Sequence, residues 1–281
     1  MTPPFPDAVV TRRSLLKVGG ATVSMAALVA ACGGDDAAAP GRVGNAPVES
    51  PAPDEEADDG TYLRTAASME LALVQLYARL TELGGLAGAQ QALVDRMASD
   101  HEANAATANE LATAAGASAF DCANQWYLDR YIGPALERVA GNADADIPES
   151  DDIARDSLRI ASTFETTVAA MYQQMIEQVR SQELRVELAP LGALAARHAA
   201  AVAITVGEAP GSYVSPATSG GDVTPDESGF TPLYAIPTTF GAVSAQDMVI
   251  GARNDAGLRF TLPVDTPAAN SYIFDNAVCA P

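Results

Sequence analysis

Residues 69–77 read Met-Glu-Leu-Ala-Leu-Val-Gln-Leu-Tyr, and residues 164–172 read Phe-Glu-Thr-Thr-Val-Ala-Ala-Met-Tyr. In both stretches a tyrosine follows a glutamate by seven residues, and the apolar residues around them recur at intervals of three and four. Such spacing places the apolar residues on one face of an α-helix. Both stretches therefore predict helices that carry a glutamate, Glu70 or Glu165, on the face that turns inward.

A second apolar helix with a histidine follows each of these stretches. His101 lies after Glu70 much as His198 lies after Glu165, and the chain has no other histidine. Breaks in the periodicity separate four helical segments. We expect these helices at about residues 61–83, 89–114, 153–180 and 183–206. Pro190 lies inside the last segment, where it either bends the helix or marks its true start.

The connections between these helices predict the topology. Short turns make each pair of consecutive helices an antiparallel hairpin. Residues 115–152 join the two hairpins, which is enough chain to cross the length of a bundle, and they include a helical stretch around Trp126–Val139. The sequence therefore predicts an all-α fold at residues 59–207, an up-down four-helix bundle with one long crossover.

Four ionisable side chains lie on the apolar faces of the expected helices: Glu70, His101, Glu165 and His198. Burial of a carboxylate is costly unless the group is paired or binds a metal ion. This polar quartet, with one member on each helix, should therefore converge on itself or on a cation. Carboxylate and imidazole ligands together suit iron, manganese or zinc. Tyr77 and Tyr172 either line the same site and donate hydrogen bonds to the carboxylates, or are ordinary core residues.

Residues 59–207 resemble the ferritin-like domains of exported bacterial proteins. Di-iron members of that superfamily carry a glutamate on the first and third helices and a Glu-x-x-His motif on the second and fourth. The polar quartet matches the two single glutamates and both histidines, whereas Ala98 and Ala195 stand where the family has its metal-bridging glutamates. The resemblance therefore implies a reduced metal site. Three states stay open: one iron, manganese or zinc ion, two ions, or a metal-free polar core.

The acidic neighbours of His101, Asp100 and Glu102, are not expected to replace the missing glutamates. Successive residues of a helix lie about 100° apart around its axis, so both carboxylates should face away from the site. The sequence therefore assigns the candidate site to the polar quartet alone, with Tyr77 and Tyr172 beside it.

Residues 1–31 resemble an export signal. Residues 11–17 read Thr-Arg-Arg-Ser-Leu-Leu-Lys, which is similar to a twin-arginine (Tat) motif, and the apolar run that follows is too short to span a membrane comfortably. The run ends Val29-Ala30-Ala31-Cys32, which resembles a lipobox. This resemblance implies cleavage before Cys32, acylation of its thiol, and anchoring at the outer face of a bacterial membrane, in the cell envelope.

The charge of the chain limits its partners. The formal net charge is −20, and the one lysine, Lys17, lies in the signal segment. Neither the phosphates of nucleic acid nor an anionic membrane surface would attract such a chain. Nucleic acid is therefore excluded as a partner, and the lipid on Cys32 is the expected membrane contact. Residues 32–58, rich in Gly, Ala, Pro, Asp and Glu, predict a disordered tether.

Residues 208–281 are predicted to form a C-terminal extension that wraps around the bundle, with its aromatic residues against the helices or, alternatively, on a partner-binding surface. Weak alternation predicts short strands at residues 230–236, 248–250 and 258–264. Once Cys32 is acylated, Cys122 and Cys279 remain. An even pair of cysteines in an exported protein suggests a disulfide.

The sequence carries no phosphate-binding glycine loop, Cys-x-x-Cys motif or serine nucleophile motif. It favours a cell-envelope lipoprotein whose reduced His/Glu site binds a metal ion or has a minor redox role. The alternative is a metal-free structural or interaction module with the same fold. Whether the protein is an enzyme stays open.

Overall fold

A computed structural model of the chain describes residues 57–207, 228–230 and 245–267. These residues are mostly helical, as expected for an all-α protein with a small strand-containing extension. In chain order the elements are α2 (Asp59–Glu82), α3 (Ala89–Ala114), α4 (Gln125–Tyr127), the π-helix η1 (Leu128–Ile132), α5 (Gly133–Ala140), the 3-10 helix η2 (Ala143–Ala145), α6 (Ile153–Gln178), α7 (Gln182–Gly207), β1 (Ala245–Ile250) and β2 (Phe260–Asp265).

The four helices expected from the sequence are confirmed within a few residues at each end, and so is a helical stretch in the crossover. Side-chain caps fix two of the starts. The Asp58 carboxylate accepts a hydrogen bond from the Thr61 amide at the start of α2, and Asp152 accepts one from the Arg155 amide at the start of α6. Such caps satisfy amides that have no partner inside the helix.

Helix α7 runs through Pro190 without a break, so Pro190 does not mark a helix start. Proline cannot donate to the carbonyl four residues earlier, that of Val186, but both residues are exposed and water can take this hydrogen bond. Among the described residues, α7 alone is long and apolar enough to cross a membrane. It also packs along α6 and contacts α3, as a core helix would.

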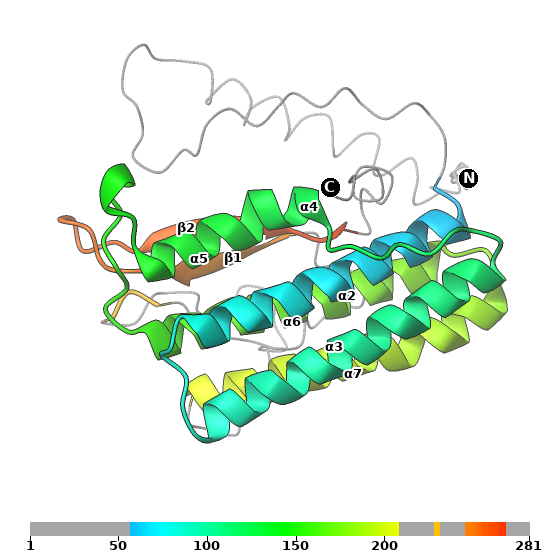
Figure 1. The fold of residues 1–281 in the computed structure, drawn as a ribbon, viewed down its shortest axis with the longest axis horizontal. Coiled ribbons are helices and arrows are strands. Elements are labelled where there is room, and N and C mark those ends of the chain that lie inside the picture. Colours follow the sequence, from blue (N-terminus) through cyan, green and yellow to red (C-terminus); the bar gives the residue numbers. More distant parts are fainter. Residues whose placement is uncertain (1–56, 208–227, 231–244, 268–281) are drawn as a thin grey trace, which may run out of the picture. The chain divides into compact units, whose positions relative to one another are not determined.

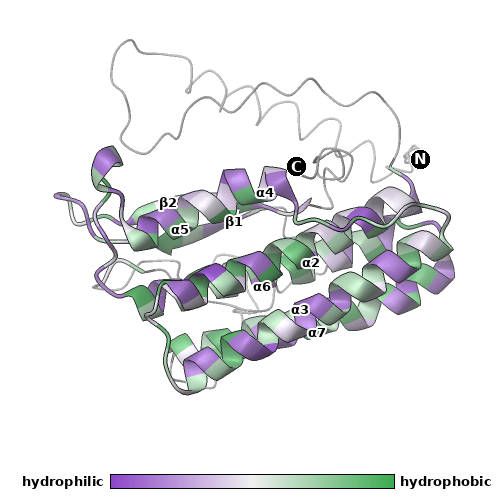
Figure 2. Cartoon of the chain, in the orientation of Figure 1, coloured by the Kyte–Doolittle hydropathy of each residue, from purple (hydrophilic) through white to green (hydrophobic). Residues whose placement is uncertain are grey.

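Two hairpins of long helices build the core. Helix α2 packs along α3 and α6 packs along α7, while α2 also contacts α6 and α3 contacts α7. In Figure 1, α2 and α6 lie between α3 and α7 on one side and α4, α5 and the strands on the other. Figure 2 shows hydrophobic and hydrophilic stretches alternating along each helix, the pattern of helices that bury one face. The inward faces of the four long helices are therefore where polar residues must find partners.

The described part of the C-terminal extension packs against α5 and α6. Strands β1 and β2 are antiparallel, in a register that runs from Ala245 opposite Asp265 to Ile250 opposite Phe260. They overlap two of the three strands expected from the sequence. Gln246 donates a hydrogen bond to the Thr163 carbonyl of α6 (2.6 Å), and the Phe230 ring lies under the guanidinium of Arg159 (4.2 Å). The Gln246 hydrogen bond fixes the hairpin to α6, and Phe230 contacts the same helix.

The export signal at residues 1–31, nearly all of the tether at 32–58, and most of the extension at 208–281 lie outside the described residues. Cys32 and Cys279 lie there too. Cys122 is half-buried in the segment that joins α3 to α4. The lipid anchor and the Cys122–Cys279 disulfide therefore stay predictions.

The close approach of α6 and α7 depends on Gly192. A Cβ atom on Gly192 would lie 2.7 Å from Cβ of Tyr172, far inside van der Waals contact. The clash would fall next to the α6 backbone, where no flexible side chain can move aside. Only glycine fits at this point of α7.

We predict that Gly192→Ala destabilises the protein, although alanine favours a helix over glycine by about 1 kcal/mol. Overpacking costs about 1–3 kcal/mol, so the free energy of unfolding, measured in urea, should fall, and Gly192→Val should lower it further. The matched control is Ala193→Gly at the next, exposed position. Its free energy of unfolding should fall only by the difference in helix propensity between alanine and glycine, about 1 kcal/mol. Equal or higher stability of Gly192→Ala would show that the two helices can move apart at no cost.

Candidate metal centre

The four members of the polar quartet come together between the long helices. Glu70 lies on α2, His101 on α3, Glu165 on α6 and His198 on α7. Glu70, His101 and Glu165 are fully buried, and His198 is 7% exposed. Ligand atoms of His101, Glu165 and His198 all lie within 4.8 Å of one another. The structure therefore brings together three of the four predicted ligands as one group that could hold a metal ion.

His101 lies between the two buried carboxylates. Its Nδ1 pairs with Oε2 of Glu70, and its Nε2 lies 2.9 Å from Oε1 of Glu165. Burial alone would lower the pKa of His101, but the negative charges of Glu165 and Glu70 raise it to about 10. Burial would likewise raise the pKa of Glu165, but His101 and His198 lower it to about 2. A protonated His101 between two carboxylates is thus the stable metal-free arrangement.

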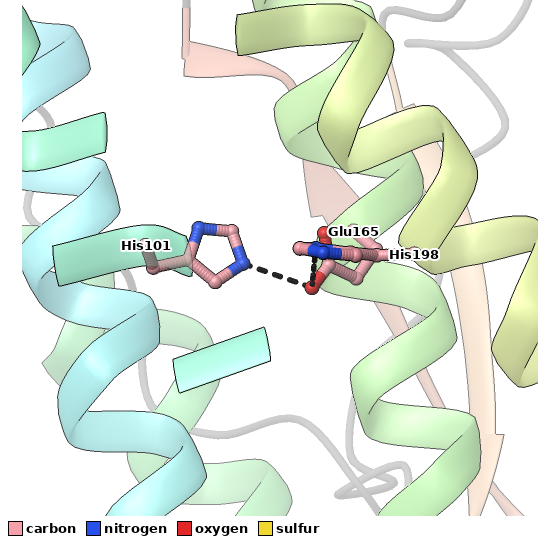
Figure 3. A group of neighbouring side chains, drawn as sticks. All are labelled: His101, Glu165 and His198. Atoms are coloured by element: carbon pink, nitrogen blue, oxygen red, sulfur yellow. Dashed lines mark hydrogen bonds and ion pairs between the residues drawn. The ribbon is translucent and has the colours of Figure 1, made fainter. Parts of the chain in front are cut away.

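His198 approaches the same carboxylate from α7. Figure 3 shows both rings directed at one oxygen of Glu165. The Nδ1 atom of His198 lies 3.3 Å from Oε1 of Glu165, without the alignment of a hydrogen bond. Its other nitrogen, Nε2, lies 3.1 Å from Oδ2 of Asp100 on α3. The carboxylate of Asp100 in turn accepts from Nε of Arg96 at 2.9 and 3.0 Å, and this hydrogen bond lowers its pKa.

The expectation that Asp100 faces away from the site is wrong. Asp100 does lie beside His101 around α3, but that rotation points it toward α7, which carries His198. Sequence reasoning treated one helix at a time and overlooked the neighbouring helix. Asn104, one helical turn after His101, was also missed: its amide donates to Oε1 of Glu70 at 3.4 Å. Its helical spacing from His101 was the available signal.

Tyr77 and Tyr172 donate hydrogen bonds to the two carboxylates, as one of the sequence-based alternatives predicted. The bonds cross between the hairpins: Tyr77 on α2 donates to Glu165 on α6, and Tyr172 on α6 donates to Glu70 on α2. Burial raises the pKa of both phenols well above the ordinary value, and the carboxylates raise it further. Both tyrosines therefore stay protonated donors that orient the glutamates.

Glu70 does not belong to the three-residue group, because it lies on the far side of the His101 ring. Its two oxygens accept from His101, Tyr172 and Asn104. In this arrangement Glu70 orients His101 rather than facing Glu165 and His198. Its role as a direct metal ligand stays a prediction.

Two polar atoms in this group are buried without a hydrogen-bond partner in the described part of the chain: Oε2 of Glu165 and Nδ1 of His198. Buried polar atoms in proteins nearly always have a partner. A carboxylate oxygen and an imidazole nitrogen are also the ligand atoms that bind iron, manganese and zinc. The residues present thus fit a metal ion. Ala195 is fully buried and Ala98 partly buried, so neither position supplies a bridge to a second ion.

No family model matches the chain, and neither the curated proteins nor the solved structures contain a significant match.

We predict that the free energy of unfolding of the metal-free protein falls at high pH because of His101 and at low pH because of Glu165. The pKa of His101 is about 10 against an ordinary 6.5, so its contribution is complete below pH 6.5 and is lost as the pH rises toward 10. The pKa of Glu165 is about 2 against 4.5, so its contribution is complete above pH 4.5 and is lost as the pH falls toward 2.

The measurement is urea unfolding of chelator-treated wild type and His101→Gln across this range. The difference in unfolding free energy between the two proteins should shrink as the pH rises from 6.5 toward 10. A difference that stays constant over this interval would mean that His101 is not held as a cation.

Proposed function

We propose that this protein is an exported, lipid-anchored, ferritin-like protein that binds one metal ion between its helices. The observation that carries the proposal is a pair of buried atoms, Oε2 of Glu165 and Nδ1 of His198, that have no hydrogen-bond partner among the described residues. Both atoms belong to the group of His101, Glu165 and His198, in an interior where an uncompensated polar atom costs about 1–3 kcal/mol. A cation at this point would supply the missing partner for both.

The roles of the side chains follow from their contacts. His101 through Nε2, Glu165 through its carboxylate and His198 through Nδ1 would hold the ion. Glu70 and Asp100 accept from the second nitrogen of each ring. Ligating histidines usually make this kind of outer contact with a carboxylate, which fixes the ring orientation. When bound, an iron or manganese ion would supply redox chemistry and zinc would supply a Lewis acid.

A single ion fits the ligand set better than two. Ferritin-like di-iron sites need bridging carboxylates, and Ala98 and Ala195 cannot provide them. Three protein ligands also leave coordination positions open for water or a substrate, as in catalytic rather than structural zinc sites. A minor redox or hydrolytic role is therefore chemically possible, but binding is the function that the contacts support directly.

One observation favours a second candidate, a metal-free structural module. His101 is already satisfied between Glu70 and Glu165, and both tyrosines hold the glutamates in place. The core is therefore stable as a hydrogen-bonded network around a protonated histidine. This candidate leaves Oε2 of Glu165 and Nδ1 of His198 unexplained.

We predict about one iron, manganese or zinc ion per chain when the protein is purified without chelator and measured by elemental analysis. The double variant His101→Ala, His198→Ala should lose the ion, whereas Glu102→Gln, an exposed carboxylate on the same helix, should keep it. Less than about a tenth of an ion in both wild type and double variant, with no uptake of added Co²⁺, would favour the metal-free module.

The ferritin-like topology is part of the same proposal. It is supported by two hairpins, α2 with α3 and α6 with α7, which are joined by one long crossover that includes α4 and α5. One polar residue per long helix meets in the middle of this arrangement, as in the family's metal sites. The export signal and the lipid anchor rest on the sequence of residues 11–32 alone.

We predict that the protein, expressed in a bacterium with Tat export and lipoprotein processing, is found in the membrane fraction with an acylated Cys32 at its N-terminus. Cys32→Ser should move it to the soluble fraction, because a chain with a net charge of −20 is repelled by anionic lipid. A double Arg12→Lys, Arg13→Lys variant should keep the precursor inside the cell. Mass spectrometry of the N-terminal peptide checks the processing, and an unmodified Cys32 in wild type would rule out the anchor.

A further inference from the structure

Asp100 is a polar residue near the site that no sequence pattern predicts and that does not belong to the group of ligand atoms. Its Oδ2 lies 3.1 Å from Nε2 of His198, on the side of the ring away from Glu165. We propose that Asp100 is a positioning residue: it keeps the proton of His198 on Nε2 and so leaves the Nδ1 lone pair directed toward Glu165 and the cation. The inference rests on the proposed metal site.

A histidine that binds a metal ion keeps only one ring proton, and two carboxylates face the two nitrogens of His198. Asp100 faces Nε2 at 3.1 Å with hydrogen-bond geometry, and Glu165 faces Nδ1 at 3.3 Å without it. A hydrogen bond from one ring nitrogen decides which tautomer is present. If Asp100 were removed, Glu165 would be the remaining carboxylate next to the ring and would draw the proton to Nδ1. The nitrogen that should bind the ion would then be blocked.

Arg96 holds Asp100 in the orientation that this role needs. Its Nε donates to both oxygens of the Asp100 carboxylate, at 2.9 and 3.0 Å. The side chain of Arg96 is 73% exposed and that of Asp100 is 16% exposed, whereas that of His198 is 8% exposed. The three groups therefore form a chain of contacts from the solvent to the site. Asp100 lies at its partly exposed middle, where a substitution does not leave a buried charge unpaired.

The same arrangement recurs at the other histidine, with a different carboxylate. Nδ1 of His101 pairs with Glu70, while its Nε2 faces Glu165. Each ring thus turns one nitrogen to Glu165 and the other to a carboxylate outside the three-residue group. Glu70 is fully buried and holds Tyr172 as well, so its removal would disturb the core. Asp100 is the member of the pair that can be tested without this complication.

The first test reads the tautomer of His198 in the chelator-treated full-length protein labelled with ¹⁵N, by long-range ¹H–¹⁵N correlation. Two histidines give a spectrum that a His198→Gln variant assigns. In wild type we expect the proton on Nε2. In Asp100→Ala we expect a shift toward the Nδ1-protonated form. Asp100→Asn should restore the wild-type pattern, because its amide oxygen still accepts from Nε2, and Glu102→Ala, an exposed neighbour, should leave it unchanged.

The second test measures Co²⁺ affinity of the same variants. Loss of a carboxylate behind a ligating histidine typically costs about 10–100-fold in metal affinity, so Asp100→Ala should bind Co²⁺ that much more weakly than Glu102→Ala, with Asp100→Asn between the two. If wild type carries the proton on Nδ1, or if Asp100→Ala leaves the tautomer unchanged, the inference is overturned. If the tautomer shifts as expected but wild type binds no Co²⁺, the positioning role stands and the proposed metal function fails.

Discussion

The structure depends on the burial of four ionisable side chains from four different helices. A carboxylate removed from water is stable only where cations or donors replace its hydration, and the helices can supply these only from one another. Glu165 of α6 finds His101 of α3, His198 of α7 and Tyr77 of α2, while Glu70 of α2 finds Tyr172 of α6. Since every contact joins different helices, none can be made by a helix alone. The polar quartet therefore specifies how the two hairpins pack, in addition to any chemistry it performs.

The crossed tyrosines extend this constraint to the apolar packing. Tyr172 reaches Glu70 only if α6 lies close to α2, and Gly192 lets α7 approach α6 at the level of Tyr172 itself. The separation of α6 and α7 and the hydrogen bond from Tyr172 to Glu70 therefore depend on each other. A change in this separation would displace the Tyr172 hydroxyl, which donates to the buried Glu70 carboxylate. Close-packed protein interiors transmit such shifts rather than absorb them. A substitution far from the histidines can in this way alter the site.

Much of this arrangement could be predicted from the sequence, because helical periodicity carries it. The four long helices and the inward direction of Glu70, His101, Glu165 and His198 follow from residue spacing on single helices. The tyrosine hydrogen bonds were one of two alternatives that this spacing left open. What could not be predicted depends on the angle between helices. Asp100 is directed at His198 by the placement of α7 beside α3, and Glu70 lies behind His101 because of the ring's orientation between α2 and α6. Residue spacing along one helix predicts neither the direction of Asp100 nor the place of Glu70. The strand pairing of β1 with β2 depended on weak alternation and was only partly anticipated.

Charge balance in the interior bears on whether the site holds an ion. Without metal, the carboxylates of Glu70 and Glu165 lie at the two nitrogens of His101, while Asp100 pairs with Arg96. Metal binding requires ionised carboxylates and neutral imidazoles, so the binding of one divalent cation would balance the charges of the two glutamates. Uncompensated charge is the most costly state in a low-dielectric interior, and this step would remove it while giving Glu165 Oε2 and His198 Nδ1 the partner that the other described residues do not provide. Glutamates in place of Ala98 and Ala195 would instead add two negative charges, which only a second cation could balance. In the proposed metal site, the two alanines and the charge of the two glutamates are therefore both consistent with one ion.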